Sequence, residues 1–406
     1  MSYPSPTVTQ STEIEALYLH VPFCFHKCHY CDFYSIVDGS GQSDSARQAP
    51  FTDALVAEIR HLAEHDGNTA TFSIRPKTIF VGGGTPTLLD VRHWRTLLET
   101  LRVSGLLDQV SEFTVEANPE TVATPLLETL RAGGVNRISI GGQSFHPNLL
   151  HTLERHHDPR SVATAVATAR RCAFDNLNLD LIFGIPGQTL AMFQEDVKRA
   201  LDLEPEHLAC YNLTYEPGTA LTQRLRDGAI QRSAEADERA MYDWLLDHMP
   251  VAAFEHYEIS NWAAMDRQGP GTTRGQPDRR CHHNLVYWRN GNWVGAGPSA
   301  ASHVAGRRWK NVSHLGRYLA SAPKAERIDE EVIPETQQAG ERLMLGLRLR
   351  RGIRLDWLEK ALDGGDPRWQ RIELLESKGL LQRDDGHLQL TRRGLWVSDA
   401  IFTELL

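Results

Sequence analysis

The sequence has little cysteine, no long apolar run and fewer basic than acidic residues. Six cysteines among 406 residues are too few for a disulfide framework. No run approaches the ~18 consecutive apolar residues of a membrane-spanning helix, and residues 1–15 lack the basic start and apolar core of a secretory signal. The 43 basic and 52 acidic residues argue against nucleic-acid binding. We therefore expect a cytoplasmic protein without an integral membrane segment, in which clustered cysteines indicate metal binding or catalysis.

Short runs rich in β-branched and aromatic residues alternate with longer runs that repeat apolar residues at helical spacing. Strands that alternate with helices in this way are parallel and are joined by right-handed crossovers. We therefore predict an α/β fold with a partial or full barrel. The predicted strands span residues 16–23, 77–83, 112–118, 136–142, 177–184 and 207–216, and the predicted helices span 51–65, 91–102, 124–134, 159–173 and 189–203.

From about residue 333 the pattern changes to three helical segments and a hairpin, which is closed by the turn-forming pair Asp385-Gly386. This order predicts a winged-helix-like module. Winged helices often bind DNA, but the acidic chain favours a substrate lid or a partner-docking role. Two stretches without periodicity, 37–50 and 265–280, are predicted loops. The predicted organisation is an N-terminal tail (1–15), a barrel domain (16–260), a connecting segment (261–332) and a C-terminal domain (333–406).

Three cysteines, Cys24, Cys28 and Cys31, follow the first predicted strand with the spacing C-x3-C-x2-C. One interpretation is a zinc site completed by His26, His29 or a distant residue. Another is a four-iron cluster in which three thiolates hold three irons and the fourth iron has no protein ligand. That iron can be chelated by the amine and carboxylate of S-adenosylmethionine (SAM), which places the sulfonium beside a one-electron donor. The neighbouring motifs favour the iron cluster.

Glycines or polar side chains also follow the other predicted strands at or near the point where each ends. The segment 82–86 reads GGGTP, Glu116 ends the third strand, Gln143 follows the fourth, and Asp180 lies within the apolar fifth. Each of these alone is commonly a turn or a structural polar group. Because the carboxyl ends of parallel strands meet at one face of a barrel, we expect them to form one polar rim with the cysteines.

At these residues the sequence resembles the radical SAM superfamily. Within it, the resemblance is to the branch that contains oxygen-independent coproporphyrinogen III oxidase and the HemW-type haem chaperones. It covers about residues 16–400 and implies a partial (β/α)6 barrel followed by a small C-terminal domain. The motifs that carry it are YLHVPFCFHKCHYCDF, GGGTPT, EANPE, RISIGGQSF, LERHH, DLIFGIPGQT, YEISN and HNLVYW.

The resemblance also implies a set of site residues. Cys24, Cys28 and Cys31 would hold a [4Fe–4S] cluster. The residues implied to surround SAM are Tyr18, Tyr30, Gly83, Gly84, Thr85, Glu116, Gln143, Arg155, Asp180 and, more weakly, Thr214.

Two features distinguish the branches of this group. The decarboxylating oxidases carry a further cysteine two residues after the third cluster cysteine, where this chain has Phe33, and a longer segment before the first strand. The HemW-type relatives carry an HNxxYW motif, which this chain matches at His283, Asn284, Tyr287 and Trp288. Imidazole binds haem iron and aromatic rings pack on the macrocycle, so the resemblance implies haem as a further cofactor. Without the resemblance, a structural loop with both aromatics in the core would be favoured.

The haem iron ligand among Cys281, His282 and His283 stays open, with His283 carried over from the motif. The resemblance predicts a haem chaperone that binds a [4Fe–4S] cluster, exchangeable SAM and haem, and passes haem to an acceptor protein. A flavodoxin or ferredoxin would serve as reductant, and we expect no coproporphyrinogen III decarboxylation. The alternatives are a radical SAM oxidase that performs this decarboxylation and a zinc-stabilised nucleic-acid-binding regulator.

Overall fold

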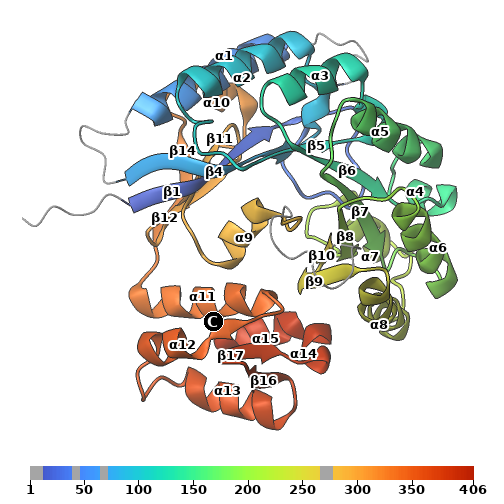
Figure 1. Ribbon diagram of the computed structural model, residues 1–406, viewed down its shortest axis with the longest axis vertical. Helices are drawn as coiled ribbons and strands as arrows, with labels where there is room; N and C mark the ends of the chain where they lie inside the picture. Colours follow the sequence, from blue (N-terminus) through green and yellow to red (C-terminus); the bar gives the residue numbers. More distant parts are fainter. Residues whose placement is uncertain (1–11, 39–45, 65–71, 266–277) are drawn as a thin grey trace, which may run out of the picture.

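The computed structural model describes residues 12–38, 46–64, 72–265 and 278–406 (Figure 1). A large sheet is covered on its outer side by helices, and a smaller C-terminal domain lies against the open side of the sheet (Figure 1). No helix within these ranges has the length and apolar character needed to cross a membrane.

The centre of the sheet consists of six parallel strands, which confirms the predicted alternation. The last strand ends four residues before the prediction. The first two strands begin earlier than predicted, because Thr12–Ile14 pairs with residues 72–74 across an irregularity in the register. In spatial order the six strands are β1 (Thr12–Val21), β4 (Phe72–Gly83), β5 (Glu112–Ala117), β6 (Arg137–Gln143), β7 (Leu177–Phe183) and β8 (His207–Asn212).

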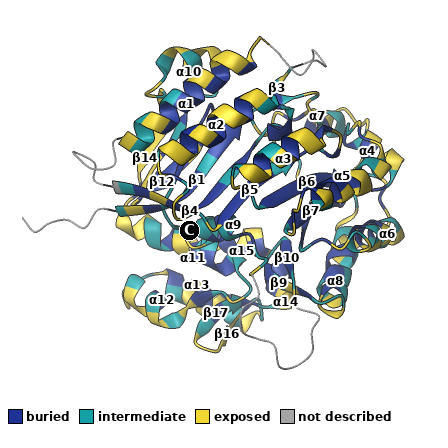
Figure 2. Cartoon of the chain, turned by 45° about the horizontal axis from the view of Figure 1, so that its top comes forward, coloured by how far each residue is buried: buried dark blue, intermediate teal, exposed yellow. Residues whose placement is uncertain are grey.

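The predicted helices cover the outer face of these strands. In Figure 2 their outer sides are exposed and the strands beneath them are buried. One helix starts as expected at Asp90, whose carboxylate accepts a hydrogen bond from the backbone nitrogen of Arg92 at 2.9 Å. Another begins at Gln48, so the predicted loop 37–50 is shorter than expected, and its residues 39–45 lie outside the described chain. The helices are α1 (Gln48–Glu64), α2 (Val91–Val103), α3 (Thr124–Ala132), α5 (Pro159–Arg171) and α6 (Leu190–Leu201).

The sheet continues beyond the six central strands at both edges and stays open, with β14 at one end and β9 at the other. The segment 261–332, predicted as a connection, contributes strands to both edges. These strands are only four to six residues long, and the last two, 307–311 and 327–332, are rich in charge, so the segment lacks the long apolar runs of the central strands. They are β10 (Asn261–Ala264), antiparallel to β8, and β11 (Trp293–Ala296), parallel to β1, followed by β12 (Ala301–Val304), β13 (Arg307–Asn311) and β14 (Arg327–Val332).

Shorter elements complete this part of the chain. Of the predicted loop 265–280, residues 266–277 lie outside the described chain. The remaining elements are β2 (Phe23–Cys24), β3 (Ile36–Val37), η1 (Pro86–Leu88), η2 (Pro119–Thr121), α4 (Pro147–Thr152), α7 (Ala220–Arg226), α8 (Glu235–Val251), β9 (Phe254–Glu258), α9 (His282–Trp288) and α10 (Leu315–Ser321).

The C-terminal domain has the predicted helices and hairpin. Asp385 and Gly386 have φ angles of 44° and 72°, which is the left-handed backbone of a two-residue hairpin turn. The hairpin belongs to an antiparallel sheet of three strands in the order β15-β17-β16. The elements are α11 (Glu335–Arg348), β15 (Ile353–Arg354), α12 (Leu355–Ala361), α13 (Arg368–Ser377), β16 (Leu381–Asp384), β17 (His387–Leu390), α14 (Arg392–Trp396) and α15 (Ser398–Leu405).

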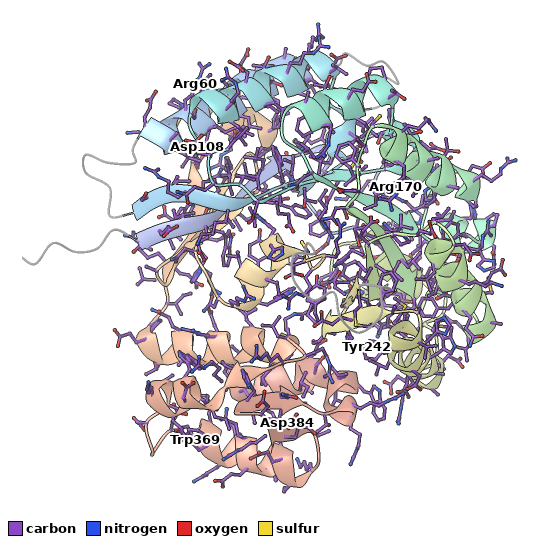
Figure 3. All side chains as sticks on the ribbon, viewed as in Figure 1. Arg60, Asp108, Arg170, Tyr242, Trp369 and Asp384 are labelled. Carbon is purple, nitrogen blue, oxygen red and sulfur yellow. The ribbon has the colours of Figure 1, made fainter. Side chains whose placement is uncertain are left out.

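The C-terminal domain is attached to α8 by polar and aromatic contacts. Arg392 forms ion pairs with Asp243 at 2.9 Å and with Asp247 at 2.5 Å. The guanidinium of Arg239 lies 3.5 Å from the ring centre of Trp396. On the same helix Tyr242, labelled in Figure 3, lines the large cavity described below. The C-terminal domain therefore closes one side of this cavity.

Candidate functional site

A cavity of about 1600 Å³ runs through the open barrel. At the carboxyl ends of the strands it is lined by the cysteine-bearing loop, and at the amino ends it reaches α9. Residues 395–399 of the C-terminal domain border it as well. The structure therefore brings together in one cavity every residue that the sequence analysis assigned to the cluster, the SAM pocket and the HNxxYW motif, although their roles remain predictions.

The three cysteines are free thiols on one loop that begins at the end of β2. The Thr85 hydroxyl donates to Cys24 Sγ at 3.7 Å, and the Arg155 guanidinium donates to Cys28 Sγ at 3.7 Å. Burial raises the pKa of Cys24, and it raises the pKa of Cys31 to about 11. Thiols in this environment need a bound cation to ionise at neutral pH, and a metal cluster would supply it.

The spacing of the thiols tests the two metal interpretations. Two sulfurs on one zinc ion lie about 3.8 Å apart, because each Zn–S bond is about 2.3 Å long. In the described part of the chain, one group of three potential metal ligands has all its ligand atoms within 4.8 Å of one another, and it consists of His26, Glu154 and His156. The sulfurs of the three cysteines therefore do not all lie within 4.8 Å of one another. Thiolates on different irons of a cluster are more widely spaced. The donor set therefore fits a cluster better than a single zinc ion.

The glycine-rich segment at the end of β4 packs against the part of the chain that leads to the cysteines. A Cβ at Gly84 would lie 2.6 Å from the carbonyl oxygen of Phe23, and one at Gly83 would lie 2.5 Å from the imidazole of His20. Gly83 also has φ of 108°, which disfavours other residues. The glycines therefore let this segment pack closely against Phe23 and His20 at the cavity wall.

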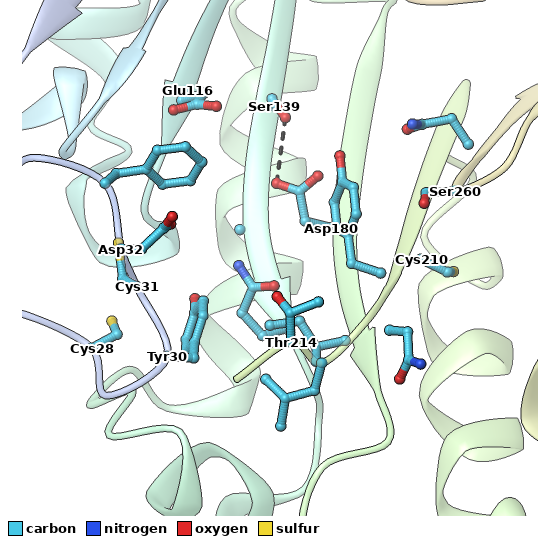
Figure 4. A pocket seen from close by; sticks show the side chains of 18 of the residues that line it. Cys28, Tyr30, Cys31, Asp32, Glu116, Ser139, Asp180, Cys210, Thr214 and Ser260 are labelled. Carbon is cyan, nitrogen blue, oxygen red and sulfur yellow. Dashed lines mark hydrogen bonds between the residues drawn. The ribbon is translucent and has the colours of Figure 1, made fainter. Parts of the chain in front are cut away.

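Two partly buried carboxyl groups, Glu116 on β5 and Asp180 on β7, face the cavity from either side of β6 (Figure 4). Burial, together with the smaller effect of the nearby Asp180, raises the pKa of Glu116 to about 8. Burial also raises the pKa of Asp180, which accepts hydrogen bonds from Asn178 at 2.7 Å and from Ser139 at 3.5 Å. The backbone nitrogen of Gly83 donates to Glu116 at 3.3 Å. Both carboxyls are suited to accept hydrogen bonds from amine or hydroxyl groups of a ligand.

The remaining pocket residues line the same cavity. Arg155 donates to the Gly141 carbonyl at 2.7 Å, while its buried Nε has no hydrogen-bond partner. Gln143 has φ of 63°, an unusual backbone for a residue other than glycine. Figure 4 shows Tyr30 beside Cys28 and Thr214 near the end of β8. Burial raises the pKa of Tyr30, so its hydroxyl stays protonated and can donate a hydrogen bond.

Tyr18 is held by a hydrogen bond to a histidine on the same strand. His20 Nε2 lies 2.9 Å from the carbonyl oxygen of Tyr34 and must donate to it. Its Nδ1 therefore accepts a hydrogen bond from the Tyr18 hydroxyl at 3.0 Å. Burial lowers the pKa of His20 to about 4, which keeps this arrangement neutral.

The HNxxYW motif forms α9 at the amino ends of the strands, opposite to the cysteines. Glu112, the first residue of β5, accepts hydrogen bonds from the backbone nitrogens of His282 at 2.8 Å and His283 at 2.9 Å. This carboxylate accepts hydrogen bonds from backbone N–H groups at the start of the helix, which have no partner within the helix itself. Asn284 and Trp288 project from the helix to line the cavity. The sequence did not indicate this role of Glu112, because no local pattern predicts a partner 170 residues away.

His283 is a buried structural residue in this conformation. Its side chain is 1% exposed, and its Nδ1 and Nε2 are hydrogen-bonded to the hydroxyls of Thr78 at 2.9 Å and Tyr287 at 2.8 Å. Burial lowers its pKa to about 3. Cys281 is equally buried, and burial raises the pKa of its thiol to about 12. The side chain of His282, in contrast, is 39% exposed.

Comparison with known proteins agrees with the cysteine motif and the open barrel. Residues 18–200 match the family model of the radical SAM superfamily, and residues 333–397 match that of the HemN C-terminal domain. In structure, the chain resembles the radical SAM coproporphyrinogen III oxidase HemN from Escherichia coli with a TM-score of 0.79 at 22% identity, covering 98% of this chain and 91% of that one. The fold and the cysteine loop thus define a radical SAM protein. Membership of this superfamily implies a [4Fe–4S] cluster and SAM; a bound cluster would be a one-electron donor for the SAM sulfonium.

The sequence is similar over nearly its whole length to proteins named haem chaperone HemW. It is 32% identical to that of Lactococcus lactis over 96% of both chains. It is 34% identical to that of Mycobacterium tuberculosis over 96% of this chain and 94% of the relative, and 34% identical to that of Escherichia coli over 78% and 79%. The chain belongs to the HemW family.

Proposed function

We propose that this protein is a haem chaperone that binds haem, a [4Fe–4S] cluster and exchangeable SAM, and transfers haem to an acceptor protein. The similarity to proteins named haem chaperone over 96% of both chains carries this proposal. An oxygen-independent coproporphyrinogen III oxidase is the second candidate, because the fold resembles HemN. A zinc-stabilised nucleic-acid-binding regulator is disfavoured by the spacing of the thiols and by the net charge of −9.

In this proposal the cysteine loop and the strand ends hold the cluster and SAM. Cys24, Cys28 and Cys31 would hold three irons of the cluster, which leaves the fourth iron without a protein ligand and available to SAM. The carboxyls of Glu116 and Asp180 accept hydrogen bonds from SAM. The residues proposed to surround them are Tyr18, Tyr30, Gly83, Gly84, Thr85, Gln143, Arg155 and Thr214, all of which line the same cavity.

For haem, the proposed iron ligand among Cys281, His282 and His283 is His282, the residue directly before the motif. Neither ring nitrogen of His283 is available without breaking a buried hydrogen bond, and the Cys281 thiol is buried, whereas His282 reaches solvent. His283 and Tyr287 instead position α9. The other polar and aromatic residues of the motif, Asn284 and Trp288, offer contacts for the macrocycle.

The test is an anaerobic haem titration of the cluster-loaded protein, followed by absorbance. We expect about one haem per chain, an imidazole-type Soret band and loss of that band in His282→Ala. In the same preparation, coproporphyrinogen III decarboxylation driven by reduced flavodoxin or ferredoxin should be undetectable. This expectation rests on Phe33, which stands at the position where the oxidases have a further cysteine. Phe33 is 64% exposed on the cysteine loop. Stoichiometric loss of two propionate carboxyl groups would instead support the oxidase.

The haem-loaded protein should then lose its haem to an added apo-haemoprotein. Transfer is measured by separating the two proteins and recording the Soret absorbance of each. Transfer faster than the dissociation of haem to a passive scavenger supports a chaperone, because passive release would give equal rates. Equal rates would mean that the protein stores haem and does not actively transfer it.

A further inference from the structure

A second group of metal-binding side chains lies beside the cysteine loop and is not used by the cluster. His26 lies on this loop, and Glu154 and His156 lie in the segment that follows α4. Their ligand atoms all lie within 4.8 Å of one another. The imidazoles of His26 and His156 meet edge to face with their centres 4.4 Å apart, and His156 Nε2 lies 3.4 Å from Glu154 Oε1.

These contacts leave a coordinating atom without a partner. Nε2 of His26 is buried and has no hydrogen-bond partner. A buried polar atom without a partner is destabilising, and an imidazole nitrogen can be satisfied by a metal ion as well as by a hydrogen bond. The two imidazoles and the carboxylate converge from two separate segments, so the group is not a consequence of neighbouring positions on one helix.

The two segments are held together by other contacts. The backbone nitrogen of His29 donates to the Leu153 carbonyl at 3.1 Å, and Arg155 donates to Cys28 Sγ at 3.7 Å. Glu154 has φ of 55°, a conformation that is uncommon outside glycine. The ligand atoms are therefore positioned near one another before any ion binds, which lowers the entropic cost of binding.

We propose that His26, Glu154 and His156 bind a divalent ion of the zinc type. Two imidazoles and one carboxylate form a known donor set for Zn²⁺, which takes a fourth ligand from water or from another molecule. The side chain of His156 is 62% exposed, so an ion can enter from solvent. The bound ion links the cysteine loop to the segment that carries Arg155.

This site is separate from the one considered for zinc in the sequence analysis. In the cysteine site, His26 would be the fourth ligand beside three thiolates. In the site formed by His26, Glu154 and His156, all three donor atoms are nitrogen or oxygen. The site can therefore be filled while the thiolates hold the iron cluster. An ion here places positive charge close to Cys28 and should restrain the loop that holds the cluster.

The experiment uses the full-length protein with its iron cluster reconstituted anaerobically. The protein is equilibrated with a small excess of zinc sulfate and dialysed, and metal content and the zinc K-edge absorption spectrum are then measured. We expect one zinc per chain with nitrogen or oxygen ligands at about 2.0–2.1 Å. His156→Ala and Glu154→Gln should weaken zinc binding by more than about 100-fold, because even the hydrogen-bond partners of metal ligands are worth about 10–100-fold.

His151→Ala is the matched control, since this exposed histidine of α4 is not part of the group. It should retain zinc like the parent, and all three variants should retain the parental iron content, which reports that the loop is intact. Zinc with sulfur ligands at about 2.3 Å would overturn the proposal, because the ion would then occupy the cysteines. Equal zinc binding by His156→Ala, Glu154→Gln and the parent, or no zinc in the parent, would overturn it too.

Discussion

Replacement of His283 by alanine separates a structural role of the HNxxYW motif from a direct role in binding iron. In the parent protein this imidazole is 1% exposed and bonded to the hydroxyls of Thr78 and Tyr287. The substitution removes the partner of the buried Thr78 hydroxyl, at about 1–3 kcal/mol, removes that of the partly buried Tyr287 hydroxyl, and adds a cavity. We expect the free energy of unfolding to fall by about 3–5 kcal/mol at pH 7.

The cost of this substitution should depend on pH. Burial, with a smaller effect of Arg137, lowers the pKa of His283 from 6.5 to about 3. Below pH 6.5 the unfolded chain binds a proton that the folded protein excludes, so the stability that His283 contributes is lost as pH falls. The alanine variant has no such group. The destabilisation should therefore shrink by about 1.4 kcal/mol for each pH unit between pH 6.5 and the folded pKa.

The assay is anaerobic urea unfolding of the cluster-loaded protein at pH 7 and near pH 5.5, followed by tryptophan fluorescence. A haem titration of the same variant should show a Soret band at the parental position, because His283 does not reach the iron, whereas His282→Ala should lose the imidazole-type band. A Soret shift in His283→Ala without loss of stability would refute this reasoning. It would mean that the imidazole leaves Thr78 and Tyr287 to coordinate haem.

Three further predictions address the cluster, the SAM pocket and the domain contact. Cys28→Ala should abolish the four-iron cluster, because only two irons would keep a protein ligand; a full iron and sulfide content would contradict the assignment. Glu116→Gln should weaken SAM binding and remove its rise between pH 7 and 9, since Glu116 ionises near its pKa of about 8 and the amide does not; equilibrium dialysis at several pH values tests this. Arg392→Ala should lower stability by about 1 kcal/mol or less, because its pairs with Asp243 and Asp247 are partly exposed, and should speed proteolysis between the domains; unchanged cleavage would show that the other contacts suffice.

Local patterns in the sequence were enough to predict the central fold and the cysteine loop. The six parallel strands depend on apolar runs bounded by turns, and the hairpin at Asp385-Gly386 depends on two residues that accept a left-handed backbone. The cysteine spacing is likewise a short-range feature. The charged outer strand β13 was missed, because it is stabilised by pairing with β12 and β14 rather than by its own apolar pattern.

Tertiary structure decided the chemical state of the individual side chains. The sequence placed a histidine in the HNxxYW motif, but Thr78 and Glu112 from distant strands determine that His283 is buried, neutral and bonded. In the same way, the pKa of Glu116 is raised because folding buries it near Asp180. Burial and hydrogen-bond partners come from chain segments that are far apart in sequence. A motif therefore determines which side chains are present, and the packing around them determines which atoms remain free to bind.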